Sequence, residues 1–374
     1  MQQIQDIIAG AVDSLSAADQ ESAAPRFRPL TGEELRRAKR AYVTTRIDLT
    51  QAARLMTAGA QPRAGDLLLA RVVKLGHHRK LESPAGRRQI LFTDDLILVC
   101  YGARYASDQF EALVPDSLAP CHLAAAGGIA GLCNARHATA RKPTEIEPLG
   151  LIADAEGRVL NLADFAERRA KGTALQPYVL AVVGSSMNAG KTTTVASMVR
   201  GLAKSGLSVG AAKVTGTGAG CDRWAMVDAG AEVVLDFTDF GYASTYQVPV
   251  ERTAAVLDAA VAALGREGCD VVVVELADGL LFPETAALAE HASFRAQVDG
   301  VVLAASDSMS AGFGADWLLQ RRLPLIGLAG KLSSSPLMIR EVEASCSVPV
   351  LGLDALESGE WTQKVGPSSK RVAA

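Results

Sequence analysis

Hydrophobic and polar residues follow two different patterns along the 374-residue chain. From about residue 178 onward, short continuous apolar runs alternate with longer stretches of helical periodicity. A continuous apolar run is typical of a parallel strand that is buried on both faces. The strands predicted in this way cover residues 179–183, 208–213, 233–237, 270–275, 300–304 and 325–330, with a last one near 348–351. The helices predicted between them cover residues 192–205, 223–229, 253–266 and 284–292. This alternation predicts an α/β fold built on a doubly wound parallel sheet.

The first half of the chain carries shorter apolar runs that are broken by turn residues. A helix is predicted over 31–41, with Thr31 as its N-cap and Glu34 at the capping-box position. A small antiparallel β unit, either barrel-like or a sandwich, is predicted from the runs 66–75, 88–92 and 95–100. In the stretch 104–150 only a tight turn or close backbone packing is indicated, at the Gly-rich residues 124–131.

These patterns divide the chain into four parts. They are a mobile arm (1–30), a smaller α+β domain with a β-rich unit (31–165), the α/β domain (176–355) and a flexible tail (356–374). The charge changes between the halves as well, because residues 1–150 carry 19 basic and 16 acidic side chains whereas residues 151–374 carry 19 and 25. The contrast favours two unlike domains, and we expect the first to hold a substrate or a partner.

The composition is that of a globular protein. It is 49% hydrophobic and 21% charged with a formal net charge of −3, which excludes wholesale disorder. So small a net charge gives no field that would attract nucleic acid or an anionic membrane. No apolar run reaches the roughly 20 residues that span a bilayer. Six scattered cysteines without a C-x-x-C pair, and a start without the features of a signal peptide, favour a cytoplasmic protein with reduced thiols.

A Gly-rich stretch carries the strongest functional signal. It follows a predicted buried strand and opens a predicted helix, which is the context of a phosphate-binding loop. Its small residues let backbone N–H groups curl around phosphate oxygens, and the helix N-terminus adds unpaired donors. The residues expected to bind nucleotide are Gly184, Ser185, Met187, Asn188, Ala189, Gly190, Lys191, Thr192 and Thr193. Lys191 would contact the β- and γ-phosphates, and the Thr192 hydroxyl would ligate Mg²⁺.

Further candidates lie where other strands of the same sheet end, the edge at which ligands bind in open α/β sheets. Lys213 ends one strand and would neutralise a phosphate; the alternative is a solvated lysine. Asp222 and Glu275 offer oxygen ligands suited to Mg²⁺, although Asp222 could equally cap the next helix. The residues expected to line a substrate site are Thr215, Gly216, Thr217, Gly218 and Asp278. Asp278 with Gly279 could instead form a tight turn.

Five residues separate Gly184 from Gly190, one more than in the usual loop. That spacing, the lysine at 213 before a Gly-containing loop, and the segment Glu275-Leu276-Ala277-Asp278-Gly279-Leu280 together resemble dethiobiotin synthetase and its relatives, a branch of the SIMIBI class of P-loop NTPases. The resemblance covers about residues 178–355. It departs from the branch at Met187, where the family has threonine, and at Ser186, where MinD-like members have a second lysine.

The resemblance implies roles for several residues. Catalysis would rest on Lys191, Lys213 and Glu275, and Mg²⁺ would be held by Thr192, Asp222 and Glu275. It also implies a homodimer with nucleotide near the interface. The loop at Lys331 does not spell N-K-x-D, so ATP is the expected nucleotide.

Two functions therefore compete. The leading one is an ATP- and Mg²⁺-dependent enzyme that activates a small carboxylate or amine by phosphoryl transfer, as a ligase or synthetase does. The alternative is a nucleotide-gated switch, adaptor or cofactor-assembly chaperone with slow intrinsic NTP hydrolysis, in which the N-terminal domain docks a protein partner. A degenerate, scaffolding P-loop is disfavoured because Lys191, Thr192 and Glu275 are all present.

Two clusters in the first half remain open. Cys121, His122, Cys133 and His137 could bind a metal, but their spacing fits no standard zinc site and buried thiols with surface imidazoles explain them better. His77-His78-Arg79-Lys80 with Arg87 and Arg88 forms a basic turn, which we expect to be solvated or to face an anionic substrate or the acidic domain. Arg141 lies in a Pro-containing loop and could reach a phosphate.

Overall fold

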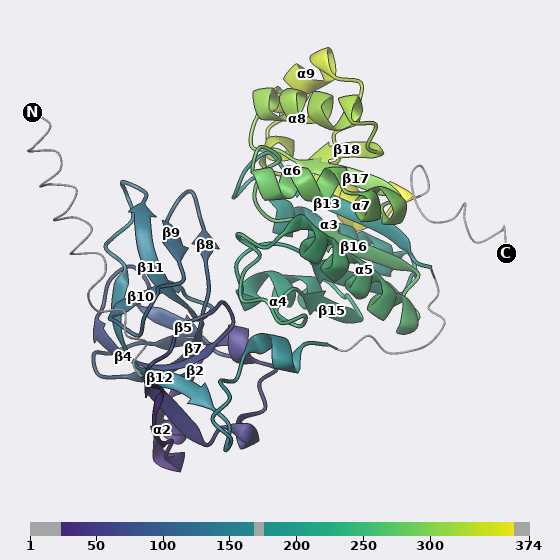
Figure 1. Ribbon diagram of the computed structural model, residues 1–374. Coiled ribbons are helices and arrows are strands. Elements are labelled where there is room, and N and C mark those ends of the chain that lie inside the picture. Colours follow the sequence, from purple (N-terminus) through teal and green to yellow (C-terminus); the bar gives the residue numbers. More distant parts are fainter. Residues whose placement is uncertain (1–23, 168–175, 363–374) are drawn as a thin grey trace, which may run out of the picture.

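The computed structural model describes residues 24–167 and 176–362, which form two domains that lie side by side (Figure 1). The expected arm and tail fall largely on residues 1–23 and 363–374, outside the described residues. Two of their expected boundaries shift. Residues Arg26–Pro29, assigned to the arm, form strand β1 and pair with β3. Residues Leu353–Ser358 form helix α10, which packs on α3.

The N-terminal domain is built mainly of strands. These are β1 (Arg26–Pro29), β2 (Lys39–Arg40), β3 (Arg54–Ala58), β4 (Leu67–Lys74), β5 (Lys80–Glu82), β6 (Arg88–Ile90), β7 (Leu96–Tyr101), β8 (Arg104–Tyr105), β9 (Phe110–Leu113), β10 (Cys121–Ala125), β11 (Ile129–Arg136) and β12 (Thr144–Ala153). Short helical segments accompany them: α2 (Gly32–Arg37), η1 (Tyr42–Thr44), η2 (Leu49–Gln51) and η3 (Leu162–Phe165).

The strand pairing of this domain closes on itself. β12 pairs with β4, β4 with β7, β7 with β11, β11 with β10, and β10 again with β12. A ring of this kind is a small closed barrel, so the barrel-like alternative is the one that the pairing fits. β1, β3, β8 and β9 extend the sheet beyond the ring, and β5–β6 form a separate ribbon. The barrel buries an apolar core that includes Leu67, Leu69, Ile97, Leu123 and Ile146.

The helix expected over 31–41 is shorter than predicted. Its capping box forms as expected between Thr31 and Glu34. The helix ends at Arg37, however, because the next residues pair with β7 as strand β2. Tertiary pairing thus overrides the local helical pattern here.

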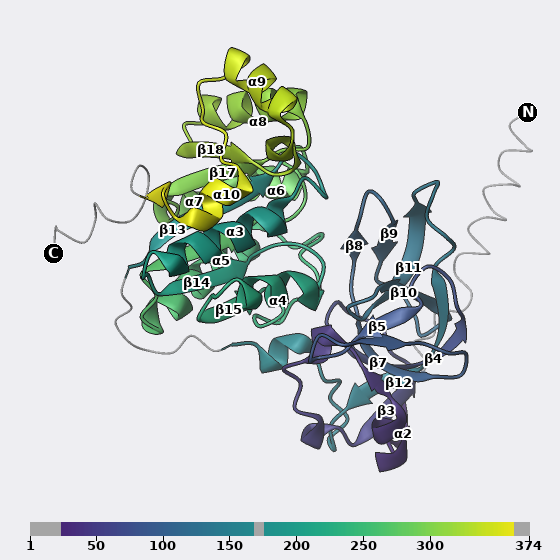
Figure 2. The same cartoon turned by 180° about the vertical axis from the view of Figure 1, so that it is seen from behind.

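The C-terminal domain is a parallel sheet covered by helices on both faces (Figure 2). Its strands are β13 (Tyr178–Gly184), β14 (Val209–Lys213), β15 (Val233–Asp236), β16 (Val271–Glu275), β17 (Gly300–Ala304) and β18 (Leu325–Ala329). Its helices are α3 (Lys191–Lys204), α4 (Gly220–Asp228), α5 (Val250–Arg266), α6 (Pro283–Glu290), α7 (Ala292–Gln297), α8 (Ser308–Gln320), α9 (Pro336–Ser345), α10 (Leu353–Ser358) and the short η4 (Lys331–Ser334).

The strands of this sheet lie in the order β15-β14-β16-β13-β17-β18 and pair in parallel throughout. One core lies under α5 to α9, and a second lies under α3, α4 and α10. The predicted doubly wound sheet is therefore confirmed. Two expected elements differ: the helix at 284–292 breaks at His291 into α6 and α7, and the strand near 348–351 is reduced to one bridge between Leu328 and Val350.

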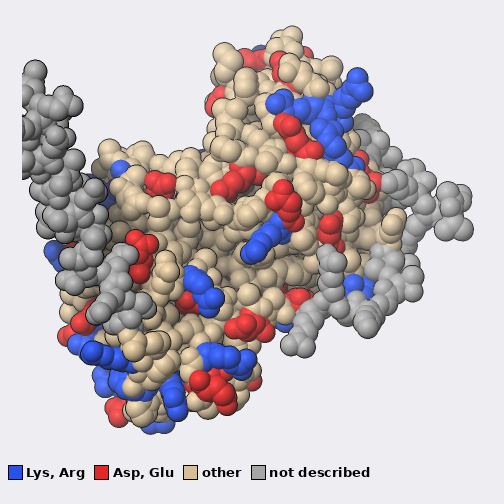
Figure 3. Space-filling model, viewed as in Figure 1, with Lys and Arg blue, Asp and Glu red and all other residues tan. Residues whose placement is uncertain are grey.

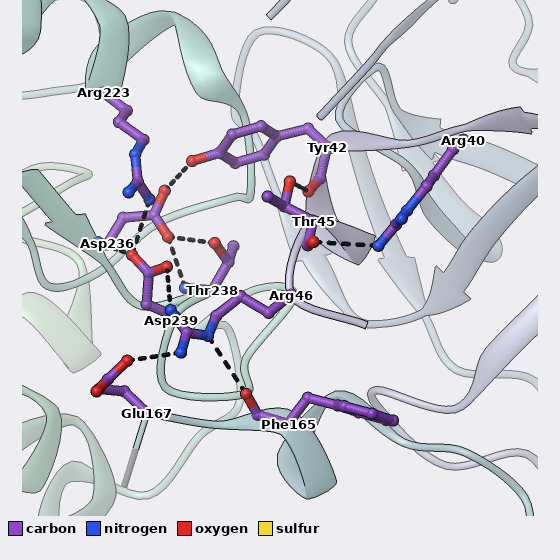
Figure 4. A network of polar contacts seen from close by, with 10 residues as sticks. All are labelled: Arg40, Tyr42, Thr45, Arg46, Phe165, Glu167, Arg223, Asp236, Thr238 and Asp239. Atoms are coloured by element: carbon purple, nitrogen blue, oxygen red, sulfur yellow. Dashed lines mark hydrogen bonds and ion pairs between the residues drawn. The ribbon is translucent and has the colours of Figure 1, made fainter. Parts of the chain in front are cut away.

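The two domains are joined by a buried polar network (Figure 4). The Tyr42 hydroxyl, from η1, donates to the carboxylate of Asp236 at the end of β15. On the other domain's side, Arg223 of α4 lies 2.8 Å from Asp239, which also faces Arg46 at 3.5 Å. Because Asp236 and Asp239 are each about 3% exposed, these contacts are shielded from solvent and fix how the domains meet.

The charged surface shows no single-sign face in the view of Figure 3, where basic and acidic side chains are interspersed over the N-terminal domain. Within the described part of the chain, none of the helices combines the length and apolar character needed to cross a membrane.

Candidate functional site

The Gly-rich loop lies where the sequence predicts it, between a buried strand and a helix. β13 ends at Gly184 and α3 begins at Lys191. Asn188 and Gly190 have left-handed φ values of 62° and 101°. Such residues turn successive backbone N–H groups toward one side of a loop, which is the geometry of an anion-binding site at a helix N-terminus.

The Lys191 side chain folds back over this loop. Its Nζ donates to the Ser186 carbonyl at 2.9 Å. A Cβ atom at Gly184 would lie 2.8 Å from that Nζ, so only glycine leaves room for the lysine there. Burial lowers the pKa of Lys191, while the charges of Glu275 and Asp278 act in the opposite direction.

Three oxygen-bearing side chains from three elements meet beside Lys191. The Thr192 hydroxyl, in the first turn of α3, lies 3.1 Å from Oδ1 of Asp222 and 3.1 Å from Oε1 of Glu275. Glu275 is 2% exposed, and its Oε2 has no hydrogen-bond partner among the described residues. Burial, followed by the neighbouring charge of Asp222, raises the pKa of Glu275. A hydroxyl and two carboxylates are the ligands that Mg²⁺ prefers, and a cation would satisfy the orphaned oxygen.

Asp222 does not cap its helix. α4 begins at Gly220 and its N-cap is Ala219, so the capping alternative is wrong. Its carboxylate instead pairs with Lys213 and approaches Thr192. Although burial acts against ionisation, the charge of Lys213 lowers the pKa of Asp222.

Lys213 is buried at the end of β14, with only 8% of its surface exposed. The solvated alternative is therefore wrong. Burial opposes its charge, but the carboxylates of Asp222 and Glu275 raise the pKa of Lys213. The group stays cationic at neutral pH and lies on the same sheet edge as the Gly-rich loop.

The loop after β14 packs between the domains. Thr215 Oγ1 accepts from the Ala277 N–H at 2.8 Å, and Gly216 donates its N–H to Thr245 Oγ1 at 2.8 Å. Thr217 bridges to Ser244, and the Gly218 N–H donates to Ala243 O at 2.9 Å. This loop is therefore held by contacts to residues 243–245 and 277, two of them through threonine hydroxyls.

Asp278 lies next to the Gly-rich loop in a strained conformation. Its φ is 65°, a left-handed value that is uncommon for a residue with a side chain. A Cβ at the following Gly279 would lie 2.6 Å from the Ser185 carbonyl oxygen. Burial raises the pKa of Asp278 against the charges of Lys191, Lys213 and Arg104. Asp278 thus lies at a bend just before the turn at residues 280–281, and Gly279 packs against the Gly-rich loop.

The remaining predicted loop residues have structural neighbours. The Ser185 N–H donates to Ala304 O at 2.9 Å, and Ala189 O accepts from the Lys331 N–H at 3.0 Å. Met187 is half-buried and Thr193 is exposed; neither side chain joins the contacts described above.

The N-terminal domain holds the helix that carries Asp222. The first N–H of α4, at Gly220, donates to the buried Glu82 carboxylate at 3.0 Å. A Cβ at Gly220 would lie 2.9 Å from the Tyr42 ring. Because Arg223, one residue after Asp222, also pairs with Asp239, the position of this carboxylate depends on the domain junction.

Sequence reasoning missed two further residues near the loop. They are Asp108, whose carboxylate accepts from the Asn188 side-chain N–H at 3.0 Å, and Arg104, which is buried on β8 with 6% of its surface exposed. Both lie in 104–150, where the sequence showed no strand pattern. The preceding apolar run, at 95–100, was the only nearby signal.

The cysteine and histidine cluster is dispersed. Cys121 is buried and Cys133 is half-buried, and the Cys133 N–H donates to Nδ1 of His122 at 3.1 Å. In the part of the chain that the structure covers, no set of three or more His, Cys, Asp or Glu side chains is arranged to hold a metal ion.

A separate cleft of about 990 Å³ lies between the domains. Its lining includes Arg63, Asn161, Tyr242, Gln247 and Arg252. The lining includes none of the Gly-rich loop residues, nor Lys213, Asp222 or Glu275. The cleft is therefore separate from the candidate site formed by the Gly-rich loop, Lys213, Asp222 and Glu275.

Comparison with protein families gives one match. Residues 179–279 match the model of the family described as "Molybdopterin guanine dinucleotide synthesis protein B". No curated protein sequence matches the chain.

Solved structures that are similar to part of the chain include two FtsY proteins, one of them described as a signal recognition particle receptor. FtsY from Elizabethkingia anophelis is 18% identical, with a TM-score of 0.35, over 51% of this chain and 61% of that chain. Chloroplast FtsY from Physcomitrella patens is 21% identical, with a TM-score of 0.35, over 53% and 68% of the two chains. Likenesses of this strength say nothing about what this chain binds.

The loop context and the family match agree on the C-terminal domain. The matched residues run from β13, through the Gly-rich loop, β14 and β16, to Gly279 beside Asp278. The C-terminal domain is therefore a parallel α/β domain with a phosphate-binding loop, and its residues 179–279 are similar to that family.

Proposed function

We propose that the protein is an ATP- and Mg²⁺-dependent enzyme that activates a small carboxylate or amine substrate by phosphoryl transfer, as a synthetase does. One observation carries the proposal: the carboxyl ends of β13, β14 and β16 bring two buried lysines together with a hydroxyl and two carboxylates. A buried constellation of this kind has no evident structural purpose, because a hydrophobic replacement would cost less.

The residues of the site would have distinct roles in the reaction. The backbone of 184–190 would cradle the phosphates, and Lys191 and Lys213 would neutralise the charge that develops on the transferred group. Thr192, Asp222 and Glu275 would hold Mg²⁺, which supplies further positive charge at the phosphate oxygens. In the transfer, a substrate oxygen forms a bond to the γ-phosphorus as the bond to the β,γ-bridging oxygen breaks, and ADP leaves with that oxygen.

A nucleotide-gated switch is the second candidate, and one observation favours it. Glu82 and Tyr42 of the N-terminal domain contact the start of the helix that carries Asp222. Occupancy of the metal and nucleotide site would then alter the domain junction, which a protein partner could read. Hydrolysis would be slow until that partner bound.

Stimulated turnover separates the two functions. ADP release from Mg-ATP would be followed with the full chain in the presence of a panel of small carboxylic acids and amines. Stimulation of at least about tenfold by one compound, absent in Lys213→Ala, supports the enzyme. If no compound stimulates turnover but a co-purifying protein does, the switch is correct.

The same samples address two further expectations. GTP is tested beside ATP, because the description of the matching family names a guanine dinucleotide. Light scattering with and without nucleotide tests the homodimer that the resemblance to SIMIBI proteins implies.

A further inference from the structure

Arg104 is an unusual cation because it is buried without a counter-charge. Its guanidinium donates to the Ala124 carbonyl and to Gln109 Oε1, the latter at 2.8 Å. Its Nε has no hydrogen-bond partner among the residues that the structure describes. Within residues 24–167 and 176–362, no carboxylate lies close enough to form an ion pair with it. Burying an unpaired charge is costly, so a site of this kind calls for an anion.

Two histidines and a second arginine lie beside Arg104. None of these side chains carries the negative charge that would balance the guanidinium. His78 Nε2 lies 3.0 Å from Nη1 of Arg104. The His77 backbone N–H donates to the Lys142 carbonyl at 2.8 Å, which brings the neighbouring Arg141 close to His77. We call Arg104, Arg141, His77 and His78 the basic cluster.

The basic cluster faces the P-loop. The carboxylates whose charges act on Arg104 include Asp108 and Asp278. Asp108 accepts a hydrogen bond from Asn188 of the loop at 3.0 Å, and Asp278 lies beside the loop and near Lys191. Stacking of Tyr105 on Phe282, with ring centroids 4.5 Å apart, fixes strand β8 against the segment that follows Asp278.

We propose that Arg104, with Arg141 and His77 beside it, binds the oxyanion of a small second substrate, a carboxylate or a phosphate, at the junction between the N-terminal domain and the P-loop. The proposal rests on the proposed function, because it names the class of molecule that the nucleotide would activate. A guanidinium recognises such oxyanions through paired N–H donors.

The geometry assigns the anion to the second substrate rather than to the nucleotide. The nucleotide's phosphates already have Lys191, Lys213 and the backbone of the loop. Arg104 lies on β8 of the N-terminal domain, beside the Asp108–Asn188 contact with the loop rather than within the loop.

Calorimetry on the full chain tests the site. Succinate and inorganic phosphate are the probes, titrated separately into protein saturated with Mg²⁺ and a non-hydrolysable nucleotide, so that the P-loop is filled. The variants are Arg104→Gln and, as a matched control, Arg54→Gln, which removes an exposed arginine on β3 of the same domain. Nucleotide affinity is measured first in each sample.

The proposal expects one probe to bind the wild type and Arg54→Gln alike, and about tenfold more weakly to Arg104→Gln, with nucleotide affinity changed less than about twofold. If Arg104→Gln does not fold, Arg141→Gln replaces it, because Arg141 is exposed, and is expected to weaken the probe about threefold. The proposal is overturned if neither probe binds the wild type up to about 50 mM, a millimolar affinity being the weakest that matters here. It is also overturned if the substitution weakens the nucleotide as much as the probe. Loss of nucleotide binding by the wild type itself would contradict the proposed function instead.

Discussion

Glu275 shows at the scale of a single residue why a buried charge points to a ligand. It ends a strand of four valines and is 2% exposed. One of its oxygens approaches Thr192 at 3.1 Å, while the other has no hydrogen-bond partner among the described residues. An orphaned carboxylate oxygen costs free energy in the folded protein. A bound cation removes that cost, so metal binding explains the buried Glu275 carboxylate better than a contribution to stability does.

The variant Glu275→Gln distinguishes a role of this residue in metal binding from a role in stability. We expect the nucleotide affinity of this variant to lose its dependence on Mg²⁺. Removing a metal ligand weakens metal binding about tenfold or more. The fold itself should be no less stable without metal, because Asp222 loses a like-charged neighbour. Calorimetry with Mg²⁺ and with EDTA measures the first effect, and thermal unfolding measures the second. The exposed Asp228→Asn on α4 is the control; a Glu275→Gln variant that keeps its Mg²⁺ dependence would contradict the metal assignment.

His78 gives a prediction about pH. Burial, with the charge of Arg104, lowers the pKa of His78 from 6.5 to about 3. The unfolded chain therefore binds a proton that the folded protein does not, and stability falls as the pH drops below about 6.5, continuing down to about pH 3. In urea unfolding between pH 4 and 7, His78→Gln should show a shallower decline than the wild type. Equal slopes would show that His78 is already protonated in the folded state or more exposed than described.

At the scale of elements, the sequence predicts the C-terminal sheet well and the N-terminal strands poorly. The parallel strands are continuous apolar runs, such as residues 271–274. A run of this kind indicates burial on both faces of the sheet. The barrel strands owe their position to partners far along the chain: β10 pairs with β12, and its own residues, Cys121–Ala125, carry no alternating pattern. Lys39–Arg40 is likewise a strand only because β7 lies beside it.

The same contrast holds for the site. The P-loop, Lys213 and Glu275 follow buried strands and could be located from local pattern. Arg104 and Glu82 lie in the N-terminal domain, and their approach to the P-loop domain is visible only in three dimensions. The missed helix α8 (Ser308–Gln320) contains two glycines, at 312 and 314, which weaken a helical pattern.

Helix α4 connects the domains to the proposed metal site, and Glu82 tests that connection. Glu82→Ala leaves the Gly220 N–H without its acceptor and frees the start of the helix two residues before Asp222. We expect Mg-nucleotide affinity to fall about threefold to tenfold, whereas Glu82→Gln, which keeps an acceptor oxygen, should restore most of it. Calorimetry makes the comparison. If the alanine variant binds like the wild type, α4 is positioned by its own domain.

At the scale of the whole molecule, the two domains meet through backbone as well as side chains. A Cβ atom at Gly127, in the turn between β10 and β11, would lie 1.8 Å from the Gly218 carbonyl oxygen in the loop after β14. The Val43 N–H donates to the carbonyl of the same Gly127 at 3.0 Å. Since carbonyl oxygens of a held loop cannot move aside cheaply, this contact requires glycine.

Gly127→Ala should therefore push the domains apart. The expected result is a loss of about 2 kcal/mol or more in unfolding free energy, together with weaker nucleotide binding. The control is Gly312→Ala on α8, where a Cβ would meet no atom within 4 Å; it should be neutral or stabilise by up to about 1 kcal/mol. Equal effects from the two substitutions in urea unfolding would show that the junction is not tightly packed.

Nucleotide binding is the central claim, and Lys191 tests it most directly. Mg-ATP and Mg-GTP would be titrated into the wild type and into Lys191→Ala by calorimetry. The account predicts that the wild type binds Mg-ATP and that the substitution weakens binding about a hundredfold or more, because the buried ammonium over the loop is lost. Folded protein that binds neither nucleotide in the presence of Mg²⁺, or a Lys191→Ala variant that binds as well as the wild type, would contradict it.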